Sequence, residues 1–249
     1  MKVLAMMGIR AGSKGYPDKN ITNLCGYPLF TWSASAAKRS KYINRLIIST
    51  DSPEYQQIIH HHGFEAPYLR PSYLANDTSP EFYFVRDLLD TLAVKEDYIP
   101  DFCVRILATV PMQLHYEIDI GIKYLMTNQE ADSAVVVSES RQHPRKSLEI
   151  SDSGQMCFPY GMSQQYSELV TPLGRSSYKK SYHRSNVIIF RTSTISRTES
   201  LTGKFCYPVI IDQLRAIDID TEVDMWCADA IMKRLSWSTE YPNLSIHTA

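Results

Sequence analysis

Short apolar, β-branched runs alternate along this chain with longer segments in which apolar residues recur at helical spacing. Such runs are typical of buried strands, and they cover Val3 to Met7, Leu46 to Ser49, Phe102 to Leu107, Ala134 to Val137 and Val187 to Phe190. The amphipathic segments predict helices over Leu29 to Lys38, Pro53 to His62, Ser79 to Val94, Glu117 to Thr127 and, near the end, Glu222 to Leu235. This alternation favours an α/β fold with a mostly parallel sheet flanked by helices, whose binding loops lie at the carboxyl ends of the strands.

The composition is that of an ordinary globular protein. Of the 249 residues 44% are apolar, and 26 Lys and Arg residues balance 27 Asp and Glu residues. A chain of this length can bury a full core as one large domain or two small ones, and the strand–helix alternation favours one domain over residues 1–249. Because there is no overall basic field, nucleic acid is not expected as a partner, and any anion site is local.

Cysteine spacing and the N-terminus bear on the cellular compartment. The five cysteines are scattered without a C-x-x-C pair, which predicts reduced thiols and neither a zinc site nor a disulfide framework. The apolar segment that opens the chain is too short for a signal peptide or a membrane span. We therefore expect a cytoplasmic protein without membrane contact.

The alternation weakens over residues 138–185, which are polar, aromatic and rich in turn residues. We interpret this stretch as an insertion within the single domain that serves as a lid or for dimer contacts. It carries cations that could meet an acidic ligand or could simply solvate the lid, namely His143, Arg145, Lys146, Arg175, Lys179 and Lys180.

A glycine-rich loop, MGIRAGSKGYPDKN, follows the first predicted strand. Glycine permits the positive φ angles with which successive backbone N–H groups can face an anion, and Arg10, Lys14 and Lys19 add the charge that a polyphosphate requires. A P-loop needs glycine before its lysine and Ser or Thr after it. Here Lys14 lies between Ser13 and Gly15, so a P-loop phosphotransferase is disfavoured, and the glycine spacing does not match the dinucleotide-binding fingerprint. A plain solvated turn is the alternative.

This loop resembles the signature of the cytidylyltransferases that activate sialic acid and related nonulosonic acids, which runs Ala-Arg-Gly-Gly-Ser-Lys-Gly, then Pro, then Lys-Asn. The resemblance continues in order through LCGYPLFTWSASAAKRSKYI, LIISTDSPEYQQIIHHHGFEAPYLRPSYLANDTS and AIDIDTEVDMWCAD, and so spans nearly the whole chain. It implies a Rossmann-like α/β fold, a homodimer, and the use of Mg²⁺ with CTP.

The resemblance also implies roles for single residues. The phosphates and ribose of the nucleotide would be held by Arg10, Ser13, Lys14, Lys19 and Asn20. These groups would neutralise charge on the α-phosphate and on the departing pyrophosphate. The cytosine would lie near Arg70, Ala75 and Ser79, and the further binding residues are Thr109 and Arg175. Asp18 stands where the family has a basic or neutral residue, and we expect its side chain to point away from the phosphates.

Asp218 and Asp220 lie two residues apart in AIDIDTEVD, a run of β type, so both side chains are predicted on one face. Hard oxygen ligands of this kind suit Mg²⁺, which keeps waters and substrate phosphates as its other ligands. The resemblance assigns the metal to these two aspartates. A second interpretation is that Asp220 or Thr221 caps the last helix, with Asp224 completing a capping box, and both can hold together.

Two further polar features have plainer interpretations. Ser49, Thr50 or Asp51 is expected to cap the helix that begins near Pro53, although a carboxylate at the strand end could also meet ribose, metal or the next helix. Arg70 directly precedes a proline, which holds the arginine backbone extended and lets its side chain be aimed. Pairing with a surface carboxylate is the alternative to a nucleotide contact at this position.

The match to the family breaks after the third predicted strand. The family carries Gln-Pro-Thr-Ser-Pro-Leu-Arg there, on the sugar side of the cleft, whereas this chain has LATVPMQ over residues 107–113. Leu107, Val110 and Gln113 replace the glutamine, serine and arginine, so polar groups for the acceptor are expected to be lost. Further on, Arg175 is the candidate for the family's arginine and Asn186 keeps its asparagine. These changes spare the nucleotide side, which favours an unusual acceptor acid.

The sequence therefore predicts a Mg²⁺-dependent cytidylyltransferase that transfers CMP from CTP to the anomeric hydroxyl of a nonulosonic acid and releases pyrophosphate. One alternative keeps the fold and activates another small acid, such as a Kdo-like sugar or a phosphonate. Another is a CTP-binding homologue whose catalysis is impaired by the altered acceptor segment. The acceptor and the general base stay open.

Overall fold

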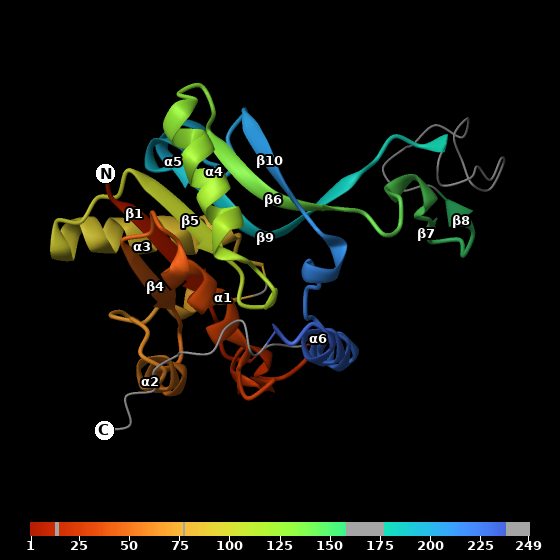
Figure 1. Ribbon diagram of the computed structural model, residues 1–249, viewed down its shortest axis with the longest axis horizontal. Coiled ribbons are helices and arrows are strands. Elements are labelled where there is room, and N and C mark those ends of the chain that lie inside the picture. Colours follow the sequence, from red (N-terminus) through yellow and green to blue (C-terminus); the bar gives the residue numbers. More distant parts are fainter. Residues whose placement is uncertain (13–14, 77, 158–176, 238–249) are drawn as a thin grey trace.

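A six-stranded sheet forms the centre of the protein. The computed structural model describes residues 1–12, 15–76, 78–157 and 177–237 of the chain. The strands of the sheet are β1 (Val3–Gly8), β4 (Arg45–Ser49), β5 (Phe102–Ile106), β6 (Ser133–Glu139), β9 (Tyr182–Arg191) and β10 (Cys206–Ile211). Their order across the sheet is β10-β6-β9-β5-β1-β4 (Figure 1).

Most strand pairs in this sheet are parallel. β1 pairs in parallel with both β4 and β5, and β10 pairs in parallel with β6. β9 alone runs against its two neighbours, β5 and β6. The prediction of a mostly parallel α/β sheet is therefore confirmed, with one strand reversed inside it.

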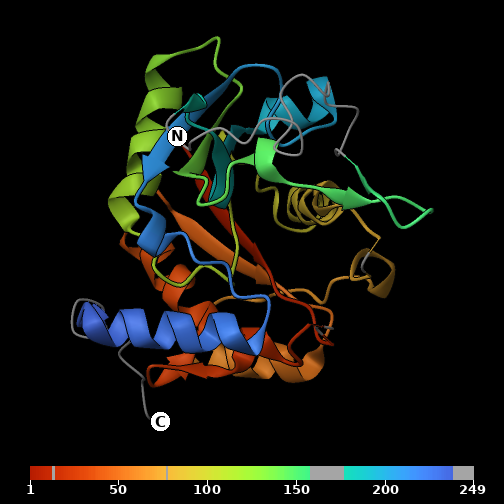
Figure 2. The same ribbon diagram turned by 90° about the vertical axis from the view of Figure 1, so that its right-hand side faces the viewer.

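Helices cover both faces of the sheet. They are α1 (Leu29–Arg39), α2 (Pro53–His61), α3 (Glu81–Glu96), α4 (His115–Thr127), α5 (Thr192–Thr198) and α6 (Glu222–Arg234). Along β1, Val3, Ala5 and Met7 pack in the core shared with α1, α2, α4 and α6, whereas Leu4 and Met6 pack in the core shared with α3 and α5. In Figure 2, α4 lies on one side of the sheet and α3 and α5 on the other. Neighbouring side chains of a strand point to opposite faces, which explains why β1 is apolar throughout.

Short elements complete the described chain. They are the strand pairs β2 (Asn23–Leu24) with β3 (Tyr27–Pro28) and β7 (Glu149–Ile150) with β8 (Met156–Cys157), and the 3₁₀ turns at Lys19–Ile21, Ser72–Leu74, Pro144–Lys146 and Gln213–Arg215. Among the described residues, no helix has both the length and the apolar character that crossing a bilayer requires.

The predicted strands and helices are all present, but α5 and β10 were not predicted. β10 is an edge strand in which buried Val209 and Ile211 alternate with exposed residues, and Pro208 interrupts its run. A half-exposed strand of this kind lacks the continuous apolar run that identifies a buried one. Proline is tolerated at such a sheet edge because an edge strand has unpaired N–H positions.

An arm projects from the sheet between β6 and β9 and carries β7 and β8 (Figure 1). The insertion was predicted over residues 138–185, yet the paired strands reach into that range. Ser138 pairs with His183, and Glu139 pairs with Tyr182. The base of the arm is therefore part of the main sheet, because β6 and β9 extend beyond their apolar segments.

Several cations predicted to serve a ligand or a lid have partners within the arm. Lys180 Nζ forms an ion pair with Glu139 at 2.8 Å. The His143 ring stacks on Tyr178 with ring centres 4.8 Å apart, and its Nε2 lies 3.0 Å from the carbonyl oxygen of Lys179. These contacts hold the two sides of the arm together.

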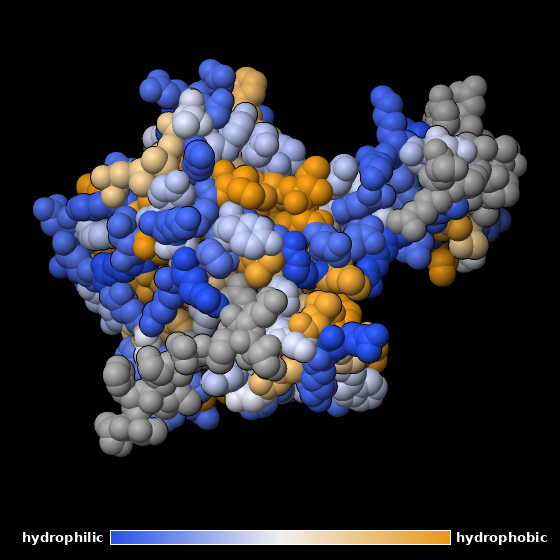
Figure 3. Space-filling model, viewed as in Figure 1, coloured by the Kyte–Doolittle hydropathy of each residue, from blue (hydrophilic) through white to orange (hydrophobic). Residues whose placement is uncertain are grey.

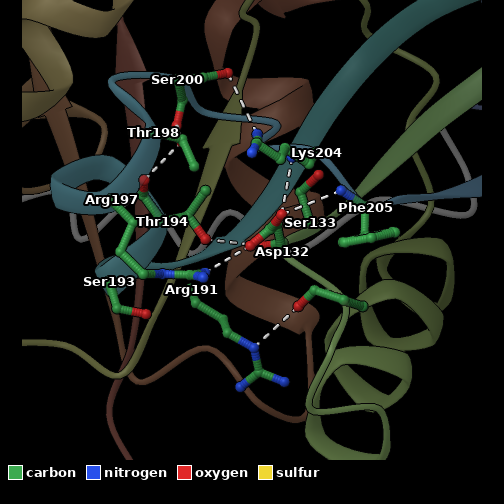
Figure 4. A network of polar contacts seen from close by, with 12 residues as sticks. Asp132, Ser133, Arg191, Ser193, Thr194, Arg197, Thr198, Ser200, Lys204 and Phe205 are labelled. Carbon is green, nitrogen blue, oxygen red and sulfur yellow. Dashed lines mark hydrogen bonds and ion pairs between the residues drawn. The ribbon is translucent and has the colours of Figure 1, made fainter.

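A buried carboxylate fastens the start of β6 to the segment between α5 and β10 (Figure 4). Asp132 Oδ2 accepts hydrogen bonds from the backbone N–H groups of Lys204 and Phe205 at 2.8 and 3.1 Å, and Oδ1 accepts one from Arg197 at 2.5 Å. Gly203 has φ +63°, and a Cβ there would lie 2.6 Å from Asp132 Cγ, so only glycine lets the backbone approach this closely. Burial raises the pKa of Asp132, but these hydrogen bonds outweigh burial and leave its pKa below the usual value.

We expect Asp132→Asn to lower the free energy of unfolding by about 2 to 4 kcal/mol at pH 7, because it removes the charge that these donors surround. The group has a depressed pKa in the folded state, so its contribution is complete above about pH 4 and disappears as pH falls further. Chemical denaturation at several pH values measures both effects. Asp152→Asn, at an exposed turn of the arm, should change stability little. Equal stability of wild type and Asp132→Asn at pH 7 would contradict this account.

Candidate active site

A cleft of about 590 Å³ opens at the carboxyl ends of β1 and β5. Ligand sites of parallel α/β sheets lie at this edge because the loops after neighbouring strands converge there. Most of the predicted site residues line this one cleft: Arg10, Lys19, Asn20, Arg70, Ala75, Ser79, Thr109 and Asp220. Residues far apart in sequence are thus brought together in one cleft. Ser13, Lys14 and Arg175 lie outside the described residues.

The glycine-rich loop packs directly against the segment that carries Asp220. A Cβ on Gly15 would lie 2.8 Å from the carbonyl oxygen of Asp220, closer than real Cβ contacts allow. Lys19 Nζ donates hydrogen bonds to Asp220 Oδ1 at 2.7 Å and to the carbonyl oxygen of Ile219 at 2.8 Å. The Lys19 side chain is 15% exposed and that of Asp220 74% exposed, so a nearly buried ammonium holds a carboxylate that faces the solvent of the cleft.

Arg70 places a buried guanidinium at the wall of the cleft. Its side chain is 6% exposed, and the nearest carboxylate, Asp51, lies 3.9 Å away. Nε and Nη2 are buried without a hydrogen-bond partner, and the group lies 5.2 Å from the ring centre of Phe84. Burial lowers the pKa of Arg70, and Asp51 opposes this effect. Since buried donors without partners are costly, this arginine is suited to an anionic or carbonyl group that enters the cleft.

Asp51 joins the loops after β1 and β4. Its Oδ1 accepts a hydrogen bond from the backbone N–H of Ala11 at 3.2 Å, and Arg10 Nη1 donates to the carbonyl oxygen of Ala75 at 3.2 Å. Asp51 therefore does not cap α2, and neither does Ser49 or Thr50. The predicted cap is therefore wrong. The N-cap is Ser52, the residue after the predicted three, and its side chain accepts a hydrogen bond from the N–H of Tyr55 at 3.2 Å.

The side chain of Asp18 does not line the cleft and contacts α2 instead. Its Oδ1 accepts a hydrogen bond from the hydroxyl of Tyr55 at 2.7 Å, and Tyr55 is buried in α2. Asp18 itself has φ 54°, a left-handed conformation that aspartate tolerates better than most residues. The residue therefore attaches the end of the glycine-rich loop to α2.

Asp218 and Asp220 are both exposed and flank buried Ile219, whose N–H donates to the carbonyl oxygen of Thr109 at 2.9 Å. The prediction of a β-type run was wrong, since residues 216–220 belong to no strand. Asp220 lines the cleft, whereas Asp218 lines a neighbouring hollow of about 500 Å³ beside His183. No group of three or more His, Cys, Asp or Glu side chains suited to a metal occurs in the described part of the chain. Two carboxylates suit Mg²⁺, which takes its remaining ligands from water and phosphate.

The predicted cap of the last helix is confirmed. Thr221 Oγ1 accepts a hydrogen bond from the N–H of Asp224 at 3.3 Å, and Asp224 Oδ2 accepts one from the N–H of Thr221 at 2.8 Å. This reciprocal pair is a capping box. It fixes the start of α6 immediately after Asp220, so the carboxylate lies on a rigid boundary of the cleft.

The segment that replaces the family's acceptor motif lies differently from the prediction. Leu107 and Thr109 line the cleft, but Val110 and Gln113 are buried and are not among its lining residues. Gln113 Nε2 donates to Glu117 Oε2 at 2.8 Å, and Glu117 forms a buried ion pair with Arg215. Gln113 therefore supports the packing of α4 against the segment before Asp218, because its side chain turns into the interior.

Asn186 fixes the same segment from β9. Its Oδ1 accepts a hydrogen bond from the N–H of Leu107 at 2.7 Å, and its Nδ2 donates to the carbonyl oxygen of Val110 at 3.1 Å. The side chain is fully buried. This asparagine orients the backbone of the cleft wall.

Glu81 also lines the cleft, and sequence reasoning did not single it out. It begins α3 and forms an ion pair with Arg105 of β5. The charged residue within the otherwise apolar run FCVRI was the available signal. A buried strand position normally excludes an unpaired charge, so such an arginine indicates a partner that sequence alone does not name.

Comparison with known proteins adds to this geometry. The family model described as Cytidylyltransferase matches residues 5–205. The chain is 26% identical to post-translational flagellin modification protein B of Campylobacter coli, over 93% of this chain and 95% of that protein. It is 27% identical to CMP-N,N'-diacetyllegionaminic acid synthase of Legionella pneumophila, over 94% of this chain and 97% of that protein. It is 25% identical to N-acylneuraminate cytidylyltransferase of Escherichia coli, where 94% of this chain spans about half, 52%, of the relative.

The fold is also similar to that of a solved structure. A CMP:2-keto-3-deoxy-manno-octonic acid synthetase complexed with CTP matches with a TM-score of 0.68, covering 94% of this chain and 100% of that chain. At 12% sequence identity, this likeness concerns the fold alone. Because the family model covers most of the sequence, from the first strand to the residue before β10, the chain belongs to the cytidylyltransferase family.

Proposed function

We propose that this protein transfers CMP from CTP to the anomeric hydroxyl of a nonulosonic sugar acid and releases pyrophosphate. Two relatives are named for the activation of acids of this class, legionaminic and N-acylneuraminic acid. The observation that carries the proposal is the cleft of a cytidylyltransferase in which Arg10, Lys19 and Arg70 converge, with two buried Arg70 nitrogens that lack a hydrogen-bond partner. Such a cleft is suited to a nucleotide with a polyphosphate tail.

In the proposed reaction the acceptor hydroxyl attacks the α-phosphorus and releases its proton to the solvent, and the bond to the β-phosphate breaks as pyrophosphate leaves with the electron pair. Arg10 and Lys19, with Ser13 and Lys14 of the same loop, neutralise the charge on the phosphates, while Asn20 binds the ribose. The cytosine lies near Arg70, Ala75 and Ser79, and the acceptor lies beyond Thr109 with Arg175 as a further binding residue. Holding the two reactants in line supplies much of the rate by proximity.

Asp218 and Asp220 would hold Mg²⁺, and their hard oxygen donors fit that ion. Bound there, the metal would supply charge neutralisation for the phosphates. The ion pair between Lys19 and Asp220 holds the carboxylate in place at the cleft. The same lysine can then share its charge between carboxylate and phosphate.

We also propose a cytoplasmic homodimer, with the insertion at 138–185 as the dimer contact or lid. Cytoplasmic location follows from the proposed use of CTP. In support of the dimer, two large apolar residues are exposed to solvent. Ile210 on the edge strand β10 is 60% exposed, and Leu214 in the turn after β10 is 49% exposed. Figure 3 shows apolar side chains gathered on the body next to the arm. Exposed apolar area next to a projecting arm is typical of a protein–protein contact.

The acceptor panel is the first test. We expect CTP-dependent release of pyrophosphate with at least one nonulosonic acid, measured by a coupled pyrophosphate assay. Turnover only with a Kdo-like acid or a phosphonate would assign the alternative acceptor, which the apolar Leu107 in the cleft keeps open. Binding of CTP in calorimetry without pyrophosphate release from any acid would identify an impaired homologue. Transfer of the γ-phosphate from ATP would contradict the proposal altogether.

Arg70→Met should weaken CTP binding about 10-fold to 100-fold, because one charge-assisted contact with the nucleotide is lost. Isothermal calorimetry with CTP measures the loss. The stability of the variant should stay close to that of wild type, since a buried charge with incomplete partners adds little to folding. Arg86→Met is the matched control, because Arg86 pairs with Asp90 on the exposed side of α3. Unchanged CTP affinity in Arg70→Met would exclude Arg70 from the nucleotide site.

Asp218→Asn and Asp220→Asn should each lower kcat by about 100-fold or more and raise the Mg²⁺ concentration needed for half-maximal rate. Titration of the rate with Mg²⁺ at saturating CTP measures this change. Asp229→Asn, on α6 and paired with Lys233, should leave both quantities unchanged. If either site variant keeps the wild-type metal dependence, that aspartate is not a ligand.

A further inference from the structure

Arg105 is a charged residue near the carboxyl end of an apolar strand. It occupies β5 between Val104 and Ile106, and its side chain is 6% exposed. Its Nη1 donates a hydrogen bond to the carbonyl oxygen of Asn186 at 2.9 Å, and its Nη2 lies 3.2 Å from Glu81 Oε2. The Nε atom is buried without a hydrogen-bond partner.

The stability of the fold does not explain this pair. Taking a guanidinium and a carboxylate out of water costs free energy that their attraction barely recovers, and an apolar side chain of similar volume often serves as well or better. Burial lowers the pKa of Arg105, and Glu81 opposes this effect. An arginine that costs this much at a buried strand position, with Nε lacking a hydrogen-bond partner, points to a function for the carboxylate that it holds.

Glu81 presents that carboxylate to the cleft. It is the first residue of α3, it lines the cleft, and its side chain is 40% exposed. The N-terminus of a helix favours a negative charge, so the start of α3 is a favourable place for this carboxylate. An ionised carboxylate has about four acceptor positions on its two oxygens, and Arg105 Nη2 lies beside one of these oxygens, Oε2. The remaining acceptor positions suit a hydrogen-bond donor that enters the cleft.

The position of the pair is on the acceptor side. Leu107 follows Arg105 by two residues, lines the cleft, and stands where the resemblance to the family predicts a glutamine. Leu107 has no polar group for an acceptor sugar. Glu81 therefore supplies, from α3, a hydrogen-bonding group to a cleft in which Leu107 supplies none.

We infer that Glu81, positioned by Arg105, determines acceptor specificity by accepting a hydrogen bond from a hydroxyl, acylamino N–H or ammonium group of the sugar acid. The inference rests on the proposed function and names the chemistry of one contact within it. A negative charge at this point also repels the acceptor's own carboxylate. The acceptor is thus oriented with a donor group toward α3 and its carboxylate away from it.

The test compares Glu81→Gln, Arg105→Met and the double variant in pyrophosphate release with the acceptor that wild type uses. Each single variant should raise the KM for the acceptor about 10-fold or more, with the KM for CTP within about twofold of wild type. The double variant should be no worse than either single variant, because the two residues act as a unit. Arg105→Met should keep or raise the melting temperature, since it removes a buried charge.

A second arm identifies the donor group. Acceptor analogues that lack one hydroxyl or acylamino group at a time are compared in wild type and in Glu81→Gln. The analogue without the donor group should bind wild type more weakly than the full acceptor does. It should bind Glu81→Gln as well as the full acceptor binds that variant. Asp90→Asn is the matched control, because it removes an exposed carboxylate from the same helix.

The outcomes separate the inference from the proposed function. If wild type releases no pyrophosphate with any sugar acid, the proposed function is wrong and this inference fails with it. If wild type is active but Glu81→Gln keeps the wild-type KM for the acceptor, the inference alone is overturned. A parallel rise in the KM for CTP would assign the pair a nucleotide-binding role and would overturn the inference. A lower melting temperature of Arg105→Met with an unchanged KM for the acceptor would assign the pair a structural role and would equally overturn it.

Discussion

The contact between the glycine-rich loop and the segment before α6 is the constraint on which the cleft depends. Gly15 lies against the carbonyl oxygen of Asp220, and Lys19 holds both Ile219 and Asp220. These groups come from opposite ends of the chain. A Cβ at Gly15 would force the two segments apart, and loss of the lysine would leave the Asp220 carboxylate without its partner. The loop that we propose for the phosphates and the aspartate that we propose for Mg²⁺ are therefore positioned by one set of contacts.

Buried cations give the cleft its chemical character. Arg70 and Arg105 are both nearly excluded from solvent, and each has a guanidinium nitrogen without a hydrogen-bond partner. In a medium of low dielectric constant such groups interact strongly with any charge that approaches, and they are costly when no partner is present. The two buried arginines lie toward the carboxyl edge of the sheet, away from the apolar centre of its cores. This edge is where the loops after the strands admit a ligand.

How well sequence predicted each part depends on the range of the interactions involved. Buried strands such as β1 and β5 were predicted because they are apolar on both faces, and the capping box of Thr221 and Asp224 because it is a local pattern. The edge strand β10 was missed because only half of it faces the core. The cap of α2 was misplaced because Thr50, Asp51 and Ser52 are all capable of capping, and tertiary contacts of Asp51 with Ala11 decided among them.

The sequence by itself determined the fold class, the loop with its cations, and the carboxylate pair before the last helix, since each is encoded in residues close together along the chain. Only the tertiary structure decided that Gln113 turns inward to Glu117, that Asp218 and Asp220 line adjoining hollows, and that Glu81 meets Arg105. These outcomes depend on how α3 and α4 pack on the sheet. Contacts between residues far apart in sequence are fixed by that packing, and no local pattern specifies them.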